Sequence, residues 1–393
     1  MVPIDFLNNE EVKAFIKERK DQDVARLMLN PPKKWKGHMK IIADQILSRQ
    51  KARGKIPSWV ENFDLIFPPP ISIEQASSES TGRYKRELIS GNHLVDLTGG
   101  MGIDCLWLSE NFKKVTYVEQ QAELCHIYQH NLNELGKVTQ VVNESAESYL
   151  SSFKGKATFY LDPARRNDAK RKVFRLEDCT PNLSELQHSL SAVSERTLIK
   201  LSPLIDITAL IQSLDRIAEI HVVSVKNECK EVLAIIDRTI RMGGPEITAV
   251  NLDSNHSKLS FHQEEERTFS TSGAQVSTYL YEPNASILKA GAFNTIAERY
   301  PVKKLQSETH LYTSGSLDTN FPGRVFEVLG HNPKNSLKKY APEGHINVIT
   351  RNYATDANKL KKKLSLKDGG NYFLIGFKDL DNKPQLVIAE RLL

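Results

Sequence analysis

The 393-residue sequence has few of the features that mark secreted, membrane-spanning or metal-binding proteins. Its four cysteines stand singly, with no C-x-x-C pair or disulfide spacing, which favours a reducing compartment and predicts a cytoplasmic protein. No apolar run approaches the roughly 20 residues that cross a bilayer. The first residues lack the basic and apolar parts of a signal peptide. The eleven histidines show no H-E-x-x-H or paired spacing, so we expect no metal site. Because no apolar run is long enough to cross a bilayer, we also expect no membrane partner.

An excess of charge of one sign is also lacking. The 53 Lys and Arg residues face 48 Asp and Glu residues, a net charge of +5 at pH 7. This small excess permits a nucleic-acid partner without requiring one. The contents of 40% hydrophobic and 26% charged residues are ordinary for a soluble globular protein, and the length predicts two or three domains. The sequence does not indicate the oligomeric state.

Residues 94–104 form the most informative stretch. An apolar segment at 94–97 is typical of a buried strand, and a glycine-rich turn follows it. Glycines let a backbone turn sharply and approach a ligand that a Cβ atom would exclude. The glycines are Gly99, Gly100 and Gly102.

The acids around this turn indicate which cofactor it holds. Glu119 ends the next apolar run, 23 residues after Asp96, and an acid at that offset binds ribose hydroxyls. A dinucleotide fingerprint would read G-x-G-x-x-G, whereas here the third glycine is missing. Asp96 would repel a pyrophosphate but could accept hydrogen bonds from an ammonium group. The sequence therefore predicts a nucleoside-containing cofactor with an amino acid end.

On these residues the chain resembles the class I S-adenosylmethionine-dependent methyltransferases, whose first motif is an acid before a glycine-rich turn. The resemblance implies a doubly wound α/β domain with a mostly parallel seven-stranded sheet. It also implies S-adenosylmethionine as the cofactor, with its ribose at Glu119. Its amino acid end would lie against Asp96, Thr98, Gly99, Gly100, Gly102 and Asp104.

Two further segments match the methyltransferase pattern less closely. One follows the third predicted strand, and the other precedes the first. After the apolar residues 141–142 the usual acid is replaced by Glu144 or Ser145, and we take Ser145 and Ala146 as the adenine edge. In similar methyltransferases the segment before the first strand lies over the cofactor. Ser77 and Ser78 are therefore contact candidates, although helix capping explains them equally well.

A second motif, Phe159–Arg166, predicts the site of methyl transfer. Here a strand ends in Asp162 and Pro163, at the sheet edge where open α/β folds bind ligands. Similar methyltransferases have an acid or Asn, then Pro-Pro and an aromatic residue, and this group aligns a planar amino nitrogen. This chain has Ala164 and Arg165 instead, which leaves the acceptor atom open. The catalytic candidates are Asp162, Pro163 and Arg165, and Asp162 also counts as a cofactor contact.

Substrate contacts are predicted beside this motif. Arg165 and Arg166 begin a basic loop, and arginine forks match phosphate geometry. The alternative is a solvated surface loop, or arginines paired with acids elsewhere. Lys200 ends the predicted strand 197–201, where it could face the substrate or lie in solvent. Cys179 and Cys229 are weighed as nucleophiles, but an isolated cysteine is usually a small buried hydrophobe.

Four regions are expected along the chain. Residues 1–75 show helical patterns, 76–270 form the methyltransferase domain, 271–321 a ferredoxin-like piece, and 322–393 a THUMP-like α+β domain. Strands are expected at 94–97, 115–118, 138–142, 157–161, 197–201, 219–225, 231–236 and 247–251. Glu282 and Pro283 are interpreted as a hinge, and one helix is expected over residues 284–300.

The tail indicates the partner. Residues 331–367 hold nine Lys or Arg against Glu343 and Asp356, a net of 9 − 2 = +7. Such a surface can bind RNA phosphates. Together with residues 162–166 and 281–290, the tail resembles a bacterial methyltransferase family with a C-terminal THUMP-like domain, which implies an RNA substrate. The alternatives are a methyltransferase for a protein or small anionic acceptor, and a non-catalytic RNA-binding protein.

Overall fold

The computed structural model describes residues 2–165, 176–239, 244–254, 258–269, 273–331 and 333–393. The basic loop 166–175 lies outside the described residues, and so does the predicted substrate residue Arg166. The chain forms two compact units, residues 1–218 with 232–243, and residues 219–231 with 244–393. The domain boundaries at 75, 270 and 321 stay predictions.

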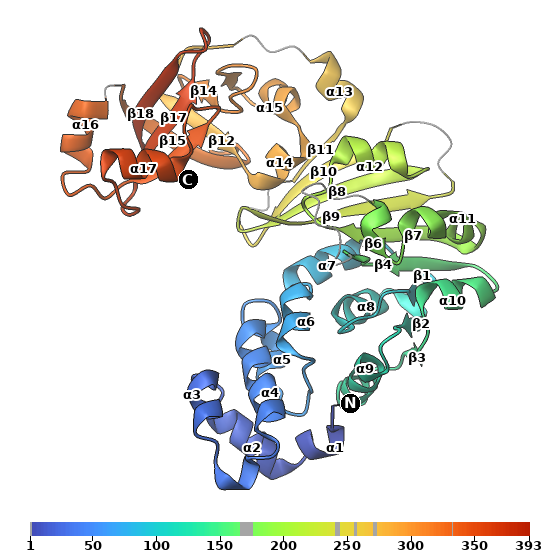
Figure 1. Ribbon diagram of the computed structural model, residues 1–393. Helices are drawn as coiled ribbons and strands as arrows, with labels where there is room; N and C mark the ends of the chain where they lie inside the picture. Colours follow the sequence, from blue (N-terminus) through green and yellow to red (C-terminus); the bar gives the residue numbers. More distant parts are fainter. Residues whose placement is uncertain (1, 166–175, 240–243, 255–257, 270–272, 332) are drawn as a thin grey trace. The chain divides into compact units, whose positions relative to one another are not determined.

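A nine-stranded, mostly parallel sheet runs in the order β11-β10-β8-β9-β7-β4-β1-β2-β3 (Figure 1). The predicted parallel pairing of the first two strands is confirmed, with Leu94 opposite Val115. The nine strands are β1 (Gly91–Asp96), β2 (Phe112–Val118), β3 (Gln140–Val142), β4 (Ala157–Leu161), β7 (Ser194–Leu201), β8 (Ile217–Val225), β9 (Glu228–Asp237), β10 (Glu246–Leu252) and β11 (Lys258–His262).

The predicted count of seven strands is wrong, because β10 and β11 extend the sheet. β10 pairs with β8 in parallel and with β11 in antiparallel orientation. Leu259 and Phe261 of β11 are buried, which gives this edge strand an apolar face of its own. A hairpin joins β8 to β9. Its two turn residues, Lys226 and Asn227, have positive φ values of 50° and 66°, as a tight two-residue turn requires.

The order of the strands creates the crevice where a ligand can bind. From β1 the chain proceeds outward to β2 and β3, and then returns to β4 on the other side of β1. Such a reversal opens a crevice at the carboxyl ends of the two central strands. Asp96 is the last residue of β1 and Asp162 follows β4 directly. The fold therefore places both predicted acids at one point.

Helices join these strands, and a short hairpin follows β4. The helices are α8 (Ile103–Ser109), α9 (Ala122–Glu134), α10 (Ala146–Ser152), α11 (Leu183–Val193) and α12 (Ile207–Ser213), with a 3-10 turn η2 (Leu176–Asp178). The hairpin consists of β5 (Ala164–Arg165) and β6 (Cys179–Thr180), where Arg165 lies opposite Cys179.

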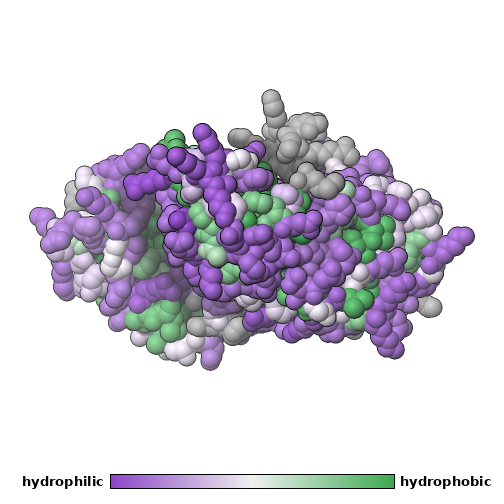
Figure 2. Space-filling model, turned by 90° about the horizontal axis from the view of Figure 1, so that it is seen from below, coloured by the Kyte–Doolittle hydropathy of each residue, from purple (hydrophilic) through white to green (hydrophobic). Residues whose placement is uncertain are grey.

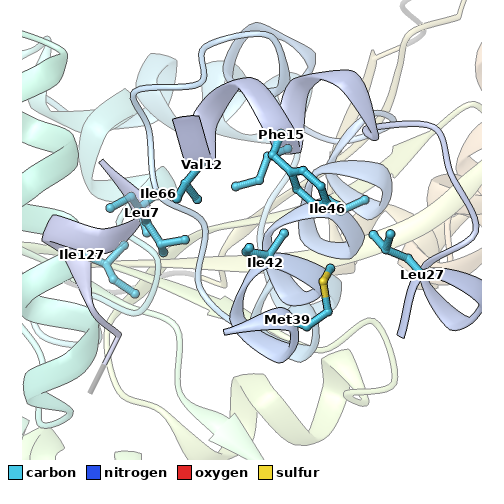
Figure 3. Packing of buried hydrophobic residues seen from close by; sticks show 10 residues of the cluster. Leu7, Val12, Phe15, Leu27, Met39, Ile42, Ile46, Ile66 and Ile127 are labelled. Carbon is cyan, nitrogen blue, oxygen red and sulfur yellow. The ribbon is translucent and has the colours of Figure 1, made fainter. Parts of the chain in front are cut away.

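The N-terminal helices pack on helix α9. Figure 3 shows Ile127 of α9 beside Leu7 and Ile66 in one apolar cluster. Polar side chains of α4 hold the proline-rich segment that follows. Gln45 exchanges two hydrogen bonds with the backbone of Phe67, and Arg49 donates to three backbone carbonyls. The elements are α1 (Ile4–Leu7), α2 (Glu10–Glu18), α3 (Val24–Leu29), η1 (Lys33–Trp35), α4 (Met39–Ala52), α5 (Pro57–Val60), α6 (Pro70–Gln75) and α7 (Glu79–Leu88).

A second sheet of seven strands, in the order β13-β14-β12-β15-β18-β17-β16, occupies the C-terminal part. The two C-terminal modules that we expected share this one sheet, because β12 pairs with β15. The strands are β12 (Tyr279–Pro283), β13 (Lys303–Lys304), β14 (Tyr312–Ser314), β15 (Gly323–Gly330), β16 (Asn347–Arg351), β17 (Tyr372–Lys378) and β18 (Pro384–Arg391). The helices of this part are α13 (Gln263–Thr268), α14 (Ala285–Ala290), α15 (Phe293–Arg299), α16 (Pro333–Tyr340) and α17 (Ala357–Leu364).

Two local predictions in this part are wrong. The helix expected over 284–300 is broken into α14 and α15 by Gly291, whose φ of 77° favours glycine. Glu282 is not part of a hinge, because it lies in β12 at 1% exposure. Its carboxylate forms ion pairs with Arg324 and Arg351 from two other strands of the sheet.

Among the described residues, none of the helices has the length and apolar character needed to cross a membrane. The face drawn in Figure 2 is mostly hydrophilic, and its hydrophobic areas are small and separate.

Candidate functional site

Asp96 lies buried at the end of β1, with 1% of its surface exposed. The backbone N–H of Thr98 donates to its Oδ1 atom at 2.9 Å. Burial raises the pKa of Asp96 well above its usual value, a shift that this hydrogen bond opposes and that the carboxylates of Asp104, Asp162 and Glu119 increase. The site therefore holds an acid that a cationic ligand would help to ionise.

Glu119 joins the glycine-rich turn to β2. Its Oε2 accepts the backbone N–H of Gly100 at 2.9 Å, and its Oε1 accepts that of Gln121 at 2.8 Å. The hydroxyl of Tyr117, on the same strand, donates to the carbonyl of Gly100 at 2.6 Å. The predicted cofactor acid therefore also shapes the turn, a role that sequence spacing did not reveal.

The three glycines of the turn serve different purposes. A Cβ atom on Gly99 would lie 2.2 Å from the ring of Tyr117, and one on Gly102 would lie 2.1 Å from the ring of Tyr128. These two rings stack at a centroid distance of 4.0 Å. Gly100 has a φ of 54°, which favours glycine, and a Cβ atom there would make only an ordinary van der Waals contact, 3.7 Å from the carbonyl oxygen of Thr98. Gly100 therefore serves the backbone conformation of the turn, whereas Gly99 and Gly102 accommodate the tyrosines.

We expect Gly102→Ala to destabilise the protein more than Gly136→Ala does. Both glycines have positive φ values, 81° and 61°, so both alanines are strained by about 1–2 kcal/mol. Only the Gly102 variant also meets an aromatic ring, because nothing lies within 4 Å of a Cβ at Gly136. Overpacking adds about 1–3 kcal/mol. Urea unfolding measures both variants, and equal losses would contradict the packing role of Tyr128.

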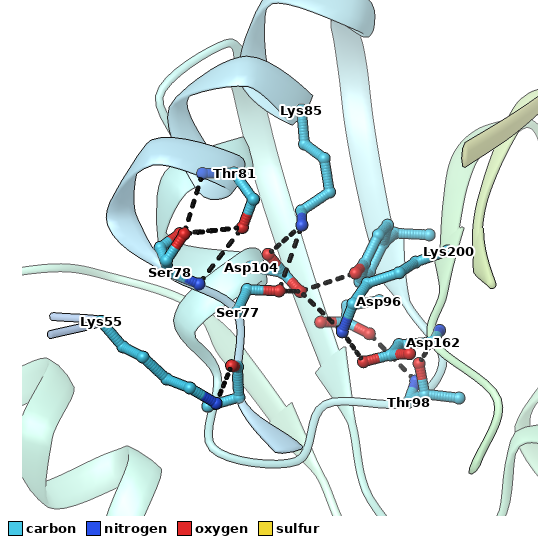
Figure 4. A network of polar contacts seen from close by, with 12 residues as sticks. Lys55, Ser77, Ser78, Thr81, Lys85, Asp96, Thr98, Asp104, Asp162 and Lys200 are labelled. Carbon is cyan, nitrogen blue, oxygen red and sulfur yellow. Dashed lines mark hydrogen bonds and ion pairs between the residues drawn. The ribbon is translucent and has the colours of Figure 1, made fainter. Parts of the chain in front are cut away.

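A buried ionic network lies beside Asp96 (Figure 4). At its centre is Asp104, in the first turn of α8. Its Oδ2 accepts hydrogen bonds from the hydroxyls of Ser77 and Tyr160, each at 2.7 Å. The Nζ atom of Lys85 lies 3.1 Å from Oδ1, and that of Lys200 lies 3.9 Å from Oδ2. Burial by itself would raise the pKa of Asp104, but the two lysines and the two hydroxyls lower it below its usual value.

Asp162 and Lys200 meet at the edge of the sheet. Lys200 Nζ forms an ion pair with Asp162 Oδ2, and the backbone N–H of Asp162 donates to Thr98 Oγ1 at 2.6 Å. The Lys200 side chain is only 12% exposed, so it is not a cation in open solvent. The sequence had placed Asp162 and Lys200 in separate roles. Pro163 is buried directly after Asp162, and the backbone of Arg165 lies in β5.

The remaining candidates are placed as follows. Ser145 is the N-cap of α10 and accepts the backbone N–H of Ser148, and Ala146 is the first residue of that helix. Ser78 caps α7, whereas Ser77 belongs to the ionic network. Their contact with a cofactor stays a prediction. Sequence reasoning gave no role to Lys85, Tyr117, Tyr128 and Tyr160, although Tyr117 and Tyr160 lie in segments that it predicted as strands.

Neither of the two cysteines weighed as nucleophiles is exposed. Cys179 is fully buried. Burial raises the pKa of Cys229 to about 11, so its thiol is protonated at neutral pH. Within the described ranges, no group of three or more His, Cys, Asp or Glu residues could hold a metal ion.

Comparisons with known proteins agree with this fold. The ferredoxin-like family model matches residues 279–322, and the THUMP domain-like model matches residues 323–391. No curated protein matches the chain significantly. An rRNA methylase of Streptococcus thermophilus is 17% identical over 40% of this chain and 93% of its own, with a TM-score of 0.30. A Streptococcus mutans protein solved with S-adenosylhomocysteine is 14% identical over 43% of this chain and 98% of its own, also at 0.30. These two scores are too low to support an argument.

One solved structure is similar over the whole length. It comes from Porphyromonas gingivalis W83 and carries the name "putative methyltransferase". It is 30% identical to this chain, has a TM-score of 0.86, and the match covers 99% of each chain. The chain therefore belongs to the same family, the class I methyltransferases with a C-terminal THUMP-like domain.

Proposed function

We propose that this protein is an S-adenosylmethionine-dependent methyltransferase that acts on RNA. The observation that carries the proposal is the acidic cluster at the reversal of strand order. Asp96, Asp162 and Glu119 lie there around the glycine-rich turn, whose Gly100 N–H donates to Glu119. Open α/β sheets bind their ligands at such a point.

The residues of the turn fit this cofactor. Its amino acid end carries an ammonium group, which a buried carboxylate such as Asp96 can bind through charge-assisted hydrogen bonds. A side chain at position 100 would strain the turn, because Gly100 has a positive φ of 54°. S-adenosylmethionine supplies an electrophilic methyl group on a sulfonium. We assign Asp96 and residues 98–102 to its amino acid end, Glu119 to its ribose, and Ser145 and Ala146 to its adenine.

The acceptor is assigned to the neighbouring edge. Asp162 lies 36% exposed beside Thr98, where its carboxylate can accept a hydrogen bond from an N–H or O–H group of the acceptor. Arg165 and Arg166 are proposed to bind substrate phosphates. The RNA substrate is supported by the THUMP-like segment and by the basic residues of the tail.

Methyl transfer itself tests the proposal. The protein is incubated with radiolabelled S-adenosylmethionine and, separately, with total RNA, total protein and a metabolite extract. We expect label in the RNA. Label in protein or metabolites would instead support the other methyltransferase function. RNA binding without any label would show a non-catalytic RNA-binding protein.

Helix α17 gives a prediction for RNA binding. Lys359, Lys362 and Lys363 are exposed on it, with Lys359 Nζ 3.3 Å from Asp356, whereas the Lys361 side chain is only 20% exposed and lies 2.7 Å from Asp368. Changing the three exposed lysines to Gln should flatten the salt dependence of RNA affinity by about 0.7 in log K per decade of salt for each phosphate that the variant no longer binds. Cofactor affinity should not change, because Asp96 and Glu119 belong to the other compact unit.

Fluorescence anisotropy with labelled RNA, between about 50 and 200 mM salt, measures this slope. Lys361→Gln is the matched control, since its side chain is only 20% exposed and pairs with Asp368, and it should change the slope less. An unchanged slope in the triple variant would show that this face of α17 is only solvated.

A further inference from the structure

We propose that Lys200 is a positioning residue that holds the Asp162 carboxylate in one orientation at the methyl-transfer edge. The role rests on the proposed function. The structural basis is a row of alternating charges from four different elements, Lys85, Asp104, Lys200 and Asp162. Its buried end is fixed, and its partly exposed end is the residue that would meet the acceptor.

The buried end of the row is held from several sides. Lys85 of α7 is 0% exposed, and besides contacting Asp104 it donates to Ser77 Oγ at 3.1 Å. Asp104 receives hydrogen bonds from Ser77, before α7, and from Tyr160 of β4. Because three elements contribute to these contacts, the Asp104 carboxylate has little freedom to rotate.

Asp104 in turn restrains Lys200. Its Oδ2 lies 3.9 Å from Lys200 Nζ, while Asp162 Oδ2 binds the same ammonium group. A lysine side chain is long and flexible, and an exposed lysine gains little from a single carboxylate. Here two carboxylates and 12% exposure hold the ammonium group in place.

The consequence falls on Asp162. Its backbone is fixed through Thr98 Oγ1, and among the described residues its carboxylate is engaged through Oδ2. The other oxygen, Oδ1, is thereby left to accept a hydrogen bond from the acceptor. Asp104 carries a negative charge on the other side of the same ammonium group, so Lys200 separates two carboxylates that would otherwise repel each other.

Lys200→Met and Lys200→Arg test the proposal, with Lys137→Met as the matched control. The Lys137 side chain is 48% exposed, and its Nζ atom lies 4.0 Å from Glu110, which makes this a weak surface pair. Its loss should leave turnover unchanged. In Lys200→Met we expect kcat to fall by about tenfold to a hundredfold, since small misplacements at a reacting centre have effects of this size. The Kd for S-adenosylhomocysteine should stay within about twofold of the parent value. Lys200→Arg should recover part of kcat, because it keeps the charge.

A second measurement does not depend on turnover. Urea unfolding of Lys200→Met, Asp162→Asn and the double variant forms a double-mutant cycle. Non-additive losses are expected, because the two residues contact each other. Additive losses would overturn the pairing, and an unchanged kcat in Lys200→Met would overturn the positioning role. If the parent protein methylates none of the three substrate pools, the proposed function fails, and the positioning role of Lys200 fails with it. The double-mutant cycle still decides whether Lys200 and Asp162 interact.

Discussion

Asp104→Ala is expected to destabilise the protein by about 3–5 kcal/mol, because removing one partner of a buried ion pair leaves the charge of the other partner uncompensated in the interior. Lys85 is fully buried against Asp104, and Lys200 and two hydroxyls face the same carboxylate. Urea unfolding at neutral pH measures the loss. Glu74→Ala is the control, since Glu74 pairs with Lys51 at 59% exposure and an exposed pair contributes at most about 1 kcal/mol.

The double variant Lys85→Met/Asp104→Leu should lose less stability than Asp104→Ala, because apolar residues often replace a buried pair with little loss of stability.

The free energy of unfolding of the parent protein should also depend on pH. The pKa of Asp104 is lowered in the folded state, so its contribution is present above the ordinary value near 4 and is lost as the pH falls below it. Asp104→Ala should remove this dependence. If Asp104→Ala lowered the free energy of unfolding by less than about 1 kcal/mol at neutral pH, the network would be as weak as a surface ion pair.

Asp96→Asn is expected to weaken S-adenosylmethionine binding by about tenfold to a hundredfold, since a hydrogen bond to a charged group contributes about 1.5–3 kcal/mol. Asn keeps the oxygen that Thr98 N–H contacts, so the turn should keep its shape. Calorimetry measures the affinity, with Asp64→Asn as the control, because Asp64 is exposed and pairs with Lys13. Equal affinity for Asp96→Asn and the parent protein would exclude Asp96 from the cofactor site.

The same variant should alter the response to pH. The pKa of Asp96 is raised in the free protein, so binding an ammonium group ionises the acid and releases a proton. Affinity in the parent protein should therefore rise with pH through that raised pKa, whereas Asp96→Asn should show no such rise. Without ligand, Asp96→Asn should be at least as stable as the parent at neutral pH. A carboxyl group whose pKa is raised by folding lowers the free energy of unfolding as the pH rises above its ordinary pKa, and Asn removes this effect. Calorimetry in buffers of different ionisation enthalpy counts the protons released.

The sequence by itself determined the centre of the fold and its two main acids. Strand 94–97, the glycine turn and Glu119 lie close together in the chain. The family resemblance that they carry implied a mostly parallel sheet, and the register of β1 and β2 is parallel. Asp162 could be placed at the same edge because it directly follows an apolar strand. These features depend on local pattern and on the rule that parallel strands end at one edge.

Only the tertiary structure decided which side chains meet there. Lys85, Tyr160 and Lys200 come from three elements far apart in the chain, and their pairing with Asp104 depends on shared burial. No spacing rule predicts such partners, since a charge is compatible with either solvent or a buried partner until the fold is known. The same reason explains the errors at the sheet edges. Whether β10 and β11 extend the first sheet, and whether β12 joins β15, depends on backbone pairing between distant strands that a local apolar pattern does not specify.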